Sequence, residues 1–377
     1  MPWMSGFDLE QSLDNPMNSQ TEYDVLIVGQ GLAGTCLAWQ LLLRGQRVMV
    51  IDREEAVTSS KIAAGLMTPV TGKRFVLSWR YAEFFEEAVR FYWDIEQQTE
   101  SSFLNLRTYT RIFRSEQERV DFVDKRAGKL ASIRFELLDS DDKVLTAFHA
   151  PEGALQIKEV GQLQVAKFLE VSRNWFRRKE SYREADIDPV HDVQIEQNRV
   201  VLDSLDCSAK CIVYCRGVED RFHPLFSSLP FLPAKGEILT MKIPQISTED
   251  VISQGIWLAP NTEGNFRIGS TYDWDHLNQE PTAQGGDQIL KTLSEILRES
   301  PHEIINHQAA VRPAMNDQKP LACFHTEEPR IGILNGLGSK GSLQAPWLAK
   351  QMAEHIVTGR ELDPETDGRR KLNSCLS

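Results

Sequence analysis

A glycine-rich turn near the N-terminus has the residue types and spacing of a phosphate-binding loop. Gly29, Gly31 and Gly34 form a G-x-G-x-x-G motif, and Asp52 follows 18 residues after the last glycine. In such a motif the first glycine makes a tight turn, the second lets the backbone approach a pyrophosphate, and the third allows a helix to pack closely on a strand. A carboxylate at the position of Asp52 accepts hydrogen bonds from a ribose. The chemistry that these residues can perform is the binding of a dinucleotide.

The segments around this motif have the order that such a site requires. An apolar, β-branched run over residues 24–28 predicts a strand, residues 32–43 predict a helix that ends at Gly45, and residues 48–51 predict a second strand. The glycines then lie at a helix N-terminus, where backbone N–H groups and the helix dipole favour phosphate. An ordinary β-α-β crossover with turn glycines is the alternative.

A second G-x-G-x-x-G motif occurs at Gly336, Gly338 and Gly341, but its surroundings differ. Only 36 residues follow Gly341, and they contain a helix-like segment and a polar tail without a second strand that ends in an acid. A strand, a glycine-rich turn and a helix N-terminus remain, and together they present N–H groups and a partial positive charge to an anion. A flexible connector before a core helix is the alternative.

Length, composition and charge limit the class of protein. The chain has 377 residues, 41% hydrophobic and 25% charged, as in an ordinary globular protein long enough for two cores. Its formal net charge is −12 and basic clusters such as residues 177–179 are short, so we expect no nucleic-acid partner. Residues 1–22 lack the basic and apolar regions of a secretion signal, which favours the cytoplasm. The oligomeric state is left open.

Two other interpretations of the sequence are weaker. Polar residues interrupt the apolar stretch 24–52 before it reaches the ~18 apolar residues that a membrane span needs. Cys207, Cys211 and Cys215 recur every fourth residue, but no histidine or fourth cysteine completes a tetrahedral metal site. We therefore expect neither a membrane span nor a metal, and we expect the six cysteines to be buried thiols rather than a disulfide framework.

Beyond the first β-α-β unit the chain alternates between helical segments and short strands. Helices are expected over residues 75–98, 115–126, 159–176 and 342–357. Strand-like runs separated by turns predict an antiparallel sheet, and they occupy residues 106–113, 132–138, 143–150, 236–243, 255–260 and 265–272. Strand-like residues 199–205 and 211–217 fall between the two groups of antiparallel strands.

This interleaving predicts a discontinuous nucleotide-binding domain with an antiparallel-sheet domain inserted twice. The nucleotide-binding domain is expected to comprise residues 22–80, 150–220 and 305–360. The substrate domain is expected to comprise residues 81–149 and 221–304, with tails at residues 1–21 and 361–377. The cleft between two such domains is the usual place for a ligand. Trp79, Tyr81, Phe84 and Trp257 are the aromatic candidates for an apolar substrate pocket.

Seven blocks of the sequence, taken in order, resemble the D-amino-acid oxidase family of FAD-dependent oxidoreductases. They are DVLIVGQGLAG with VMVID, SSKIAAGLMTP, VYCRGVED, PAKGEILTM, GIWLAPNTEGNFRIGSTYDWD, VRPAMNDQKP and ILNGLGSKGSLQAPWLAKQMA. The family includes glycine oxidase, sarcosine oxidase and the FAD domain of a bifunctional tRNA uridine-modifying enzyme. The resemblance implies an α/β chain with an α+β second lobe: a Rossmann-like FAD-binding domain of the glutathione-reductase type and an interleaved antiparallel-sheet substrate domain.

The resemblance also implies which residues line the FAD, most of them small because the backbone itself must approach the cofactor. They are Gly29, Gly31, Leu32, Ala33 and Gly34 at the pyrophosphate; Asp52 at the adenosine ribose, with Arg53 beside it; Ser59, Ser60, Ala64, Gly65, Leu66 and Met67 along the ribityl chain and flavin; Gly217 near the adenine; and Gly336, Gly338, Ser339, Lys340 and Gly341 at the flavin pyrimidine. The FAD is expected to be noncovalent, because Cys323 aligns with a structural position rather than the linking one.

For the substrate, the resemblance implies four candidate catalytic residues. Arg312 matches the arginine that pairs with the substrate carboxylate, and a guanidinium suits that role because it donates two parallel hydrogen bonds. A structural salt bridge at a lobe boundary is the alternative for Arg312. Tyr272 is a second polar contact over the flavin, with a plain core or rim tyrosine as the alternative. Arg267 is the candidate for a basic residue near flavin N5. Lys340 is a neighbouring cation where glycine oxidase has an arginine that aligns here with Ser339.

The expected reaction is oxidation of the C–N bond of a small amine or amino acid. A hydride passes to flavin N5, the resulting imine hydrolyses in water, and oxygen or another acceptor reoxidises the flavin. A tRNA-modifying FAD oxidoreductase that acts on a carboxymethylaminomethyl-uridine, a non-catalytic flavoprotein and a quinone-linked dehydrogenase are the alternatives. The substrate side chain and chirality are left open.

Overall fold

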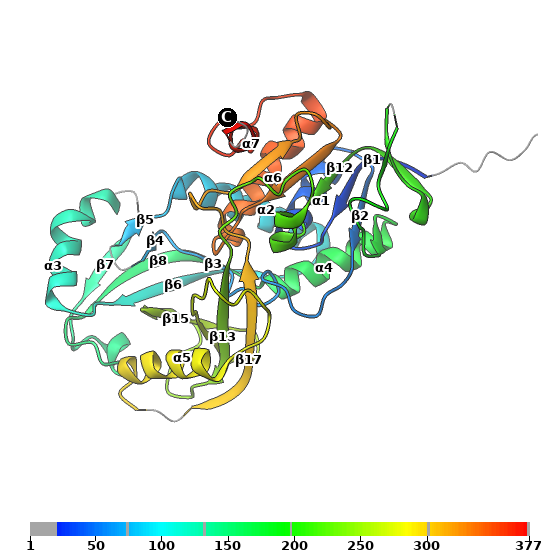
Figure 1. The fold of residues 1–377 in the computed structure, drawn as a ribbon. Helices are drawn as coiled ribbons and strands as arrows, with labels where there is room; N and C mark the ends of the chain where they lie inside the picture. Colours follow the sequence, from blue (N-terminus) through cyan, green and yellow to red (C-terminus); the bar gives the residue numbers. More distant parts are fainter. Residues whose placement is uncertain (1–20, 73–74, 131–132, 197, 300–301, 375–377) are drawn as a thin grey trace, which may run out of the picture.

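The fold consists of two β-sheets, each with its own helices (Figure 1). The computed structural model describes residues 21–72, 75–130, 133–196, 198–299 and 302–374. Of the expected N-terminal tail over residues 1–21, residues 1–20 lie outside these ranges, and Thr21 begins the first strand. Within them, no helix is both long and apolar enough to cross a bilayer.

The smaller sheet is built around β1 (Thr21–Val28), which pairs in parallel with β2 (Val48–Asp52) and with β12 (Cys207–Tyr214). Its outer strands are β9 (Tyr182–Glu184) and β19 (Ile331–Asn335), both parallel, and β10 (Gln194–Ile195), β11 (Val200–Leu202) and β18 (Leu321–Phe324), which are antiparallel. The apolar ends of β1 and β2 are buried, as expected for parallel strands covered on both faces.

Helices pack on this sheet through the first hydrophobic core. They are α1 (Leu32–Leu42), α2 (Tyr81–Thr99), α4 (Val165–Arg178) and α6 (Gly341–Thr358). Helix α1 contacts both α4 and α6, so the glycine turn that starts α1 lies next to the start of α6. The parallel sheet and the two antiparallel edges confirm the Rossmann-like half of the expected α/β fold.

The larger sheet has nine strands and is antiparallel except for the pairing of β14 with β6. In order it contains β17 (Glu303–Arg312), β13 (Ala234–Lys242), β16 (Phe266–Gly269), β15 (Ile256–Pro260), β14 (Val251–Gln254), β6 (Leu104–Ile112), β8 (Ala154–Leu163) and β3 (Leu66–Met67), with β7 (Phe135–Leu138) on β8. Helices α3 (Glu116–Lys125) and α5 (Ala283–Ile296) flank it, and β4 (Val70–Thr71) and β5 (Val76–Leu77) form a separate pair.

Two long strands belong to a different sheet from the one that the sequence predicts. β8 and most of β17 lie in ranges that the sequence analysis gave to the nucleotide-binding domain, yet both pair within the larger sheet. The chain therefore passes between the sheets at other positions than the pattern indicates. The domain boundaries themselves stay a prediction.

Four local predictions differ from the structure. Residues 143–150 do not form a strand, because Asp142 accepts a hydrogen bond from the Val144 amide and caps a 3-10 turn, η2 (Lys143–Leu145). Helix α2 begins at Tyr81 rather than residue 75, because residues 76–77 form β5. The segment 159–176 is split, with its first five residues in β8.

The fourth difference is at the C-terminus. Residues 361–374, the described part of the expected tail, pack on the protein: Leu362 and Leu372 are each 5% exposed, and the segment ends in α7 (Arg369–Ser374). An ion pair between Arg80 and Asp363, at 2.9 Å, ties this segment to the start of α2.

Candidate functional site

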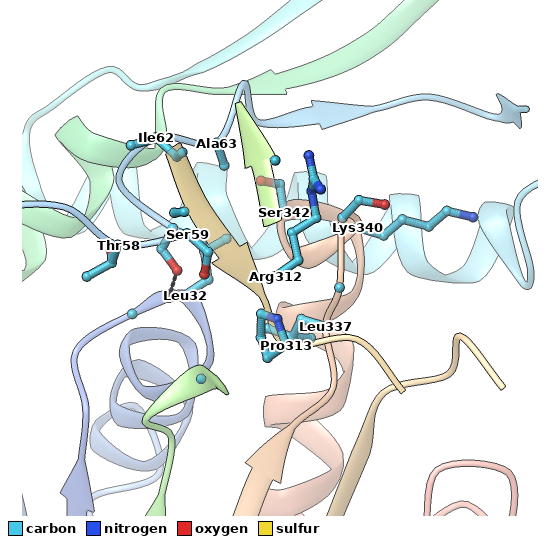
Figure 2. Close-up of a pocket in the computed structure, with 18 of the residues that line it drawn as sticks. Leu32, Thr58, Ser59, Ile62, Ala63, Arg312, Pro313, Leu337, Lys340 and Ser342 are labelled. Atoms are coloured by element: carbon cyan, nitrogen blue, oxygen red, sulfur yellow. Dashed lines mark hydrogen bonds between the residues drawn. The ribbon is translucent and has the colours of Figure 1, made fainter. Parts of the chain in front are cut away.

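A cavity of about 640 Å³ lies between the two sheets. Its lining includes the carboxyl ends of β1, β2 and β19 from the smaller sheet and the residues Gly236, Trp257 and Arg312 from the larger sheet. The carboxyl edge of a parallel α/β sheet is where such folds bind their ligands. In Figure 2, Ser59, Ile62 and Ala63 lie on one side of this cavity, and Arg312 and Lys340 lie on the other.

Two helix N-termini open into the cavity. Helix α1 begins at Leu32 and α6 at Gly341, neither has a side-chain cap, and neither carries an acidic residue in its first turn. Their starts meet, since a Cβ on Gly341 would lie 3.0 Å from Leu32 Cδ1. The Leu32 amide donates to Ser60 Oγ, and the other first-turn N–H groups and two converging helix dipoles make this part of the cavity a site for anions.

At two glycines of the first motif, Gly29 and Gly34, the neighbouring backbone leaves no room for a side chain. Gly29 has φ +104°, and a Cβ there would lie 2.5 Å from the Cys215 carbonyl oxygen. A Cβ on Gly34 would lie 1.9 Å from the Gly29 carbonyl oxygen, so α1 packs directly on the turn. Gly31 lines the cavity, and the Ser60 hydroxyl beside it accepts a hydrogen bond from the Leu32 amide at 3.2 Å.

Asp52 is held with its carboxylate at the cavity wall. Oδ2 accepts a hydrogen bond from the Gln30 amide at 2.6 Å, and Oδ1 accepts one from the Glu54 amide at 2.8 Å. A carboxylate has about four acceptor positions, so two stay available for ribose hydroxyls. Arg53 also lines the cavity, but its guanidinium forms ion pairs with Glu55 and Glu219.

The structure brings most of the predicted cofactor residues into the cavity wall. These are Gly29, Gly31, Leu32, Ala33, Asp52, Arg53, Ser59, Ser60, Ala64, Gly65, Leu66, Gly217, Gly338, Ser339, Lys340 and Gly341. Three others lie outside it. Gly34 and Gly336 serve backbone packing, the latter at φ +80°, and Met67 is fully buried in the first core.

Arg312 is partly buried at the end of β17 among neutral partners. Its Nη2 donates hydrogen bonds to Ser270 Oγ at 2.7 Å and to the Thr271 carbonyl at 3.3 Å, and Nη1 donates to the Lys235 carbonyl at 3.3 Å. No carboxylate of the described residues forms an ion pair with it, and desolvation lowers its pKa. A cation that is largely removed from water without an anionic partner is costly, so this guanidinium is suited to a ligand carboxylate.

A single glycine makes room for this arginine. A Cβ on Gly236 would lie 1.8 Å from Arg312 Nη2 and within 2.5 Å of two more guanidinium atoms. The sequence analysis missed this residue, although an isolated glycine in the strand-like run 236–243 is a known signal of close approach.

Tyr272 and Lys340 lie nearby but differ in exposure. Tyr272 lines the cavity with its ring 4.4 Å from Arg312 Cζ, and 51% of its surface is exposed. Lys340 precedes α6, and burial lowers its pKa. In Figure 2 the Lys340 amine and the Arg312 guanidinium extend in different directions. The two cations therefore do not form one clamp in this structure.

Arg267 is placed differently from the expectation. It does not line the cavity; its Nη1 donates to the Ala63 carbonyl at 2.9 Å and to the Lys61 carbonyl at 3.4 Å. It therefore holds the segment that carries Ala63 and Ala64 against β16. Strand alternation puts Arg267 on the same face as Gly269, but the guanidinium lies beneath this loop.

The aromatic and cysteine predictions can also be compared with the structure. Trp257 lines the cavity, whereas Tyr81 and Phe84 are buried in the first core and Trp79 packs against it. The five cysteines in the described residues are buried and free: Cys36, Cys207, Cys211, Cys215 and Cys323. Within the same ranges, no cluster of three or more His, Cys, Asp or Glu side chains could hold a metal ion.

The sequence matches the FAD-dependent oxidoreductases of the DAO family over residues 24–355. The chain belongs to this family. It is 24% identical to glycine oxidase from Bacillus licheniformis over 349 residues, which cover 89% of this chain and 93% of that protein. It superposes on the crystal structure of glycine oxidase from Bacillus cereus with a TM-score of 0.78 and 20% identity, covering 90% of this chain and 96% of the other.

A shorter match has higher identity. Over 141 residues the chain is 34% identical to the tRNA 5-methylaminomethyl-2-thiouridine biosynthesis bifunctional protein of Marinobacter nauticus. That alignment covers 34% of this chain and only 22% of the length of the relative. The family membership confirms the expected class of enzyme, an FAD-dependent oxidoreductase, and FAD as its cofactor.

The uncapped helix starts, the glycine cradle and the fixed carboxylate of Asp52 fit this cofactor. The first two suit a pyrophosphate and the third suits an adenosine ribose.

Proposed function

We propose that this protein oxidises the C–N bond of a small amine that carries a carboxylate. The observation that carries the proposal is Arg312, a partly buried guanidinium in the cavity wall without a carboxylate partner among the described residues. A substrate carboxylate would complete its hydrogen bonding with two parallel N–H···O contacts. The similarity to glycine oxidase supports the same class of substrate.

The chain's residues would hold the cofactor noncovalently. The N-terminus of α1 and the carboxylate of Asp52 would bind its adenosine diphosphate part, and the N-terminus of α6 would stabilise negative charge on the flavin pyrimidine. Cys323 supports the absence of a covalent link, because it lies outside the cavity wall and burial raises the pKa of its thiol to about 12. Bound FAD supplies the hydride acceptor.

The remaining cavity residues would orient the substrate. Arg312 would fix the carboxylate, Tyr272 would cover it from the solvent side, and Trp257 would pack against the apolar part. A dedicated general base is not needed if the amine binds in its neutral form. The imine leaves the site and hydrolyses in water. The electron acceptor, oxygen or another oxidant, is outside this proposal.

The test is the visible spectrum of the purified holoenzyme under nitrogen. Pools of D-amino acids, L-amino acids, N-methyl amino acids and simple amines are added in turn. We expect one pool that contains carboxylates to bleach the flavin band, and that pool names the substrate class. A flavin band that persists through every pool contradicts the proposal.

A second candidate function is the oxidation of a modified uridine in tRNA. The similarity to the bifunctional tRNA-modifying protein favours it, since a carboxymethylaminomethyl group is also a secondary amine with a carboxylate. The formal net charge of −12 speaks against an RNA partner. A tRNA gel shift that weakens with salt would support this candidate, and its absence would leave the small-molecule function. We propose the cytoplasm as the location for either.

A further inference from the structure

Two arginines lie at the end of the cavity away from the nucleotide-binding sheet. Arg111, in β6, and Arg114, just before α3, both belong to the cavity wall. Arg111 is only 6% exposed; its guanidinium carbon lies 3.8 Å from the Phe75 ring centre, and Nη2 is 3.5 Å from Glu118 Oε1. This ion pair with Glu118 engages one nitrogen of the guanidinium, so its other N–H groups stay available for a ligand.

The start of α3 fixes the position of Arg114. Ser115 caps the helix by accepting a hydrogen bond from the Glu118 amide, and Glu118 Oε2 accepts one from the Arg114 amide at 2.7 Å. The Arg114 side chain then lies over Gly255, where a Cβ would be 2.3 Å from Nη2. No hydrogen bond or ion pair engages its guanidinium within the described residues.

The register of the larger sheet indicates that the guanidiniums of Arg114 and Arg312 lie a short distance apart. Trp257 of β15 pairs with Gly269 of β16, so the residues around Gly255 face those around Ser270. Arg312 binds Ser270, and Arg114 lies over Gly255. Neighbouring strands are about 4.8 Å apart, so the two guanidiniums are separated by one to two strand spacings, on the order of 10 Å.

The carboxylates of the cavity wall lie at one end. Among the described residues they are Asp52, Glu55, Asp186 and Glu219, all on segments at the edge of the smaller sheet. The wall arginines at that end have acidic partners, Arg53 in Glu55 and Glu219 and Arg216 in Asp220. On the larger-sheet side, one substrate carboxylate can satisfy Arg312, and Arg111 has Glu118, so Arg114 is the cation that is then without an anion.

We infer that Arg111 and Arg114 form a second anion-binding subsite, and that the substrate is an amine with two acidic groups. Arg312 binds the carboxylate next to the reacting C–N bond, and the two arginines bind a second carboxylate on the other side of the gap of roughly 10 Å between the guanidiniums. This inference rests on the proposed function, because it names the substrate class of the same site. The selectivity comes from Arg114, whose guanidinium is left without an anionic partner by a substrate with one acidic group.

The test uses dicarboxylates that cannot be oxidised. The holoenzyme is titrated with glutarate and with butyrate, and the change in flavin absorbance gives each Kd. We expect glutarate to bind at least about ten-fold more tightly than butyrate. In Arg114→Gln this advantage should disappear, and in Arg126→Gln it should persist. Arg126 ends the same helix outside the cavity wall, so the control removes one charge without touching the site.

The outcomes separate this inference from the proposed function. Equal Kd values for glutarate and butyrate in the unmodified protein overturn the second subsite, even if amines bleach the flavin under nitrogen. A glutarate advantage that Arg114→Gln removes supports the subsite, even if no amine bleaches the flavin and the proposed function fails. A tRNA gel shift that Arg114→Gln abolishes, with glutarate and butyrate equal, assigns the arginines to RNA phosphate and overturns the diacid.

Discussion

At the scale of single residues, Arg312 decides which substrates fit. It is partly buried, and its guanidinium is hydrogen-bonded only to a hydroxyl and to carbonyl oxygens of the described residues, all of which are neutral. Replacing it with leucine removes two charge-assisted hydrogen bonds to a carboxylate, each worth about 1.5–3 kcal/mol. We expect Arg312→Leu to lower kcat/KM for carboxylate amines by about 100-fold or more while FAD content stays unchanged.

Steady-state kinetics and the flavin-to-protein absorbance ratio measure both effects. The control is Arg199→Leu, which removes an exposed arginine paired with Glu196 on the surface. Unchanged kinetics in Arg312→Leu would remove Arg312 from the substrate site.

Gly236 gives a second test that keeps the charge. A Cβ at this position overlaps the guanidinium of Arg312, which must move because the opposing atoms belong to a flexible side chain. We expect Gly236→Ala to raise KM for carboxylate amines about ten-fold with little change in Tm. Gly128→Ala is the matched control, since a Cβ there meets no atom within 4 Å and φ is not positive. A KM equal to that of the control would show that Arg312 does not need its present position.

At the scale of elements, positions where the local backbone requires glycine could be predicted from the sequence. Contacts between residues far apart in the sequence could not. The roles of Gly29 and Gly34 could be predicted, because a tight turn and a close helix contact require glycine independently of the rest of the fold. Arg111 and Arg114 were missed because their cavity neighbours, around Gly255, are about 140 residues away in the sequence. Arg267 was misplaced because strand alternation gives its face of the sheet and not the loop that covers that face.

The short helix η4 (Gly217–Phe222), at the nucleotide end of the cavity, leads into a buried histidine with a pH-dependent effect. His223 is 3% exposed, its Nδ1 accepts a hydrogen bond from the Leu225 amide, and burial lowers its pKa from 6.5 to about 4. As the pH falls below 6.5, His223 binds a proton in the unfolded chain, whereas in the folded protein it stays neutral until about pH 4. This contribution to stability is complete above pH 6.5, and up to about 3 kcal/mol is lost as the pH falls to 4.

We therefore expect His223→Asn to lose less stability than the unmodified protein between pH 7 and pH 4.5. Urea unfolding at the two pH values measures the difference. His302→Asn, at an exposed position, should keep the original pH dependence. Parallel pH curves for the unmodified protein and His223→Asn would contradict the assignment.

At the scale of the whole molecule, one ligand would contact both sheets. The cavity wall is formed by the carboxyl ends of β1, β2 and β19 and by the face of the larger sheet that carries Gly236 and Gly269. FAD should therefore raise the Tm of the FAD-free protein. At a free FAD concentration of 100 times its Kd, the free energy of unfolding should increase by about 2.7 kcal/mol. FMN lacks the adenosine that Asp52 and α1 would hold, so it should stabilise much less. Thermal unfolding with each flavin measures this, and equal shifts would contradict the placement of the adenosine.

The alternation of two sheets was predictable, while the exact path between them was not. Separate groups of strand-like runs indicated two sheets, and the apolar runs at β1 and β2 indicated which one is parallel. β8 was partly read as helix because its buried residues do not alternate; its last residues, 160–163, are all buried. A strand buried on both faces has the same apolar pattern as a short buried helix.

The central claim is that a partly buried arginine, Arg312, selects amines by their carboxylate and presents them to FAD. The most direct measurement is the rate of flavin bleaching under nitrogen by a pair of compounds that differ only in that group. One is the amino acid that the pool experiment identifies, and the other is its primary amide. We predict that the acid bleaches the flavin at least about 100-fold faster than the amide in the unmodified protein, and that Arg312→Leu abolishes this preference. Equal rates for acid and amide in the unmodified protein would contradict the account.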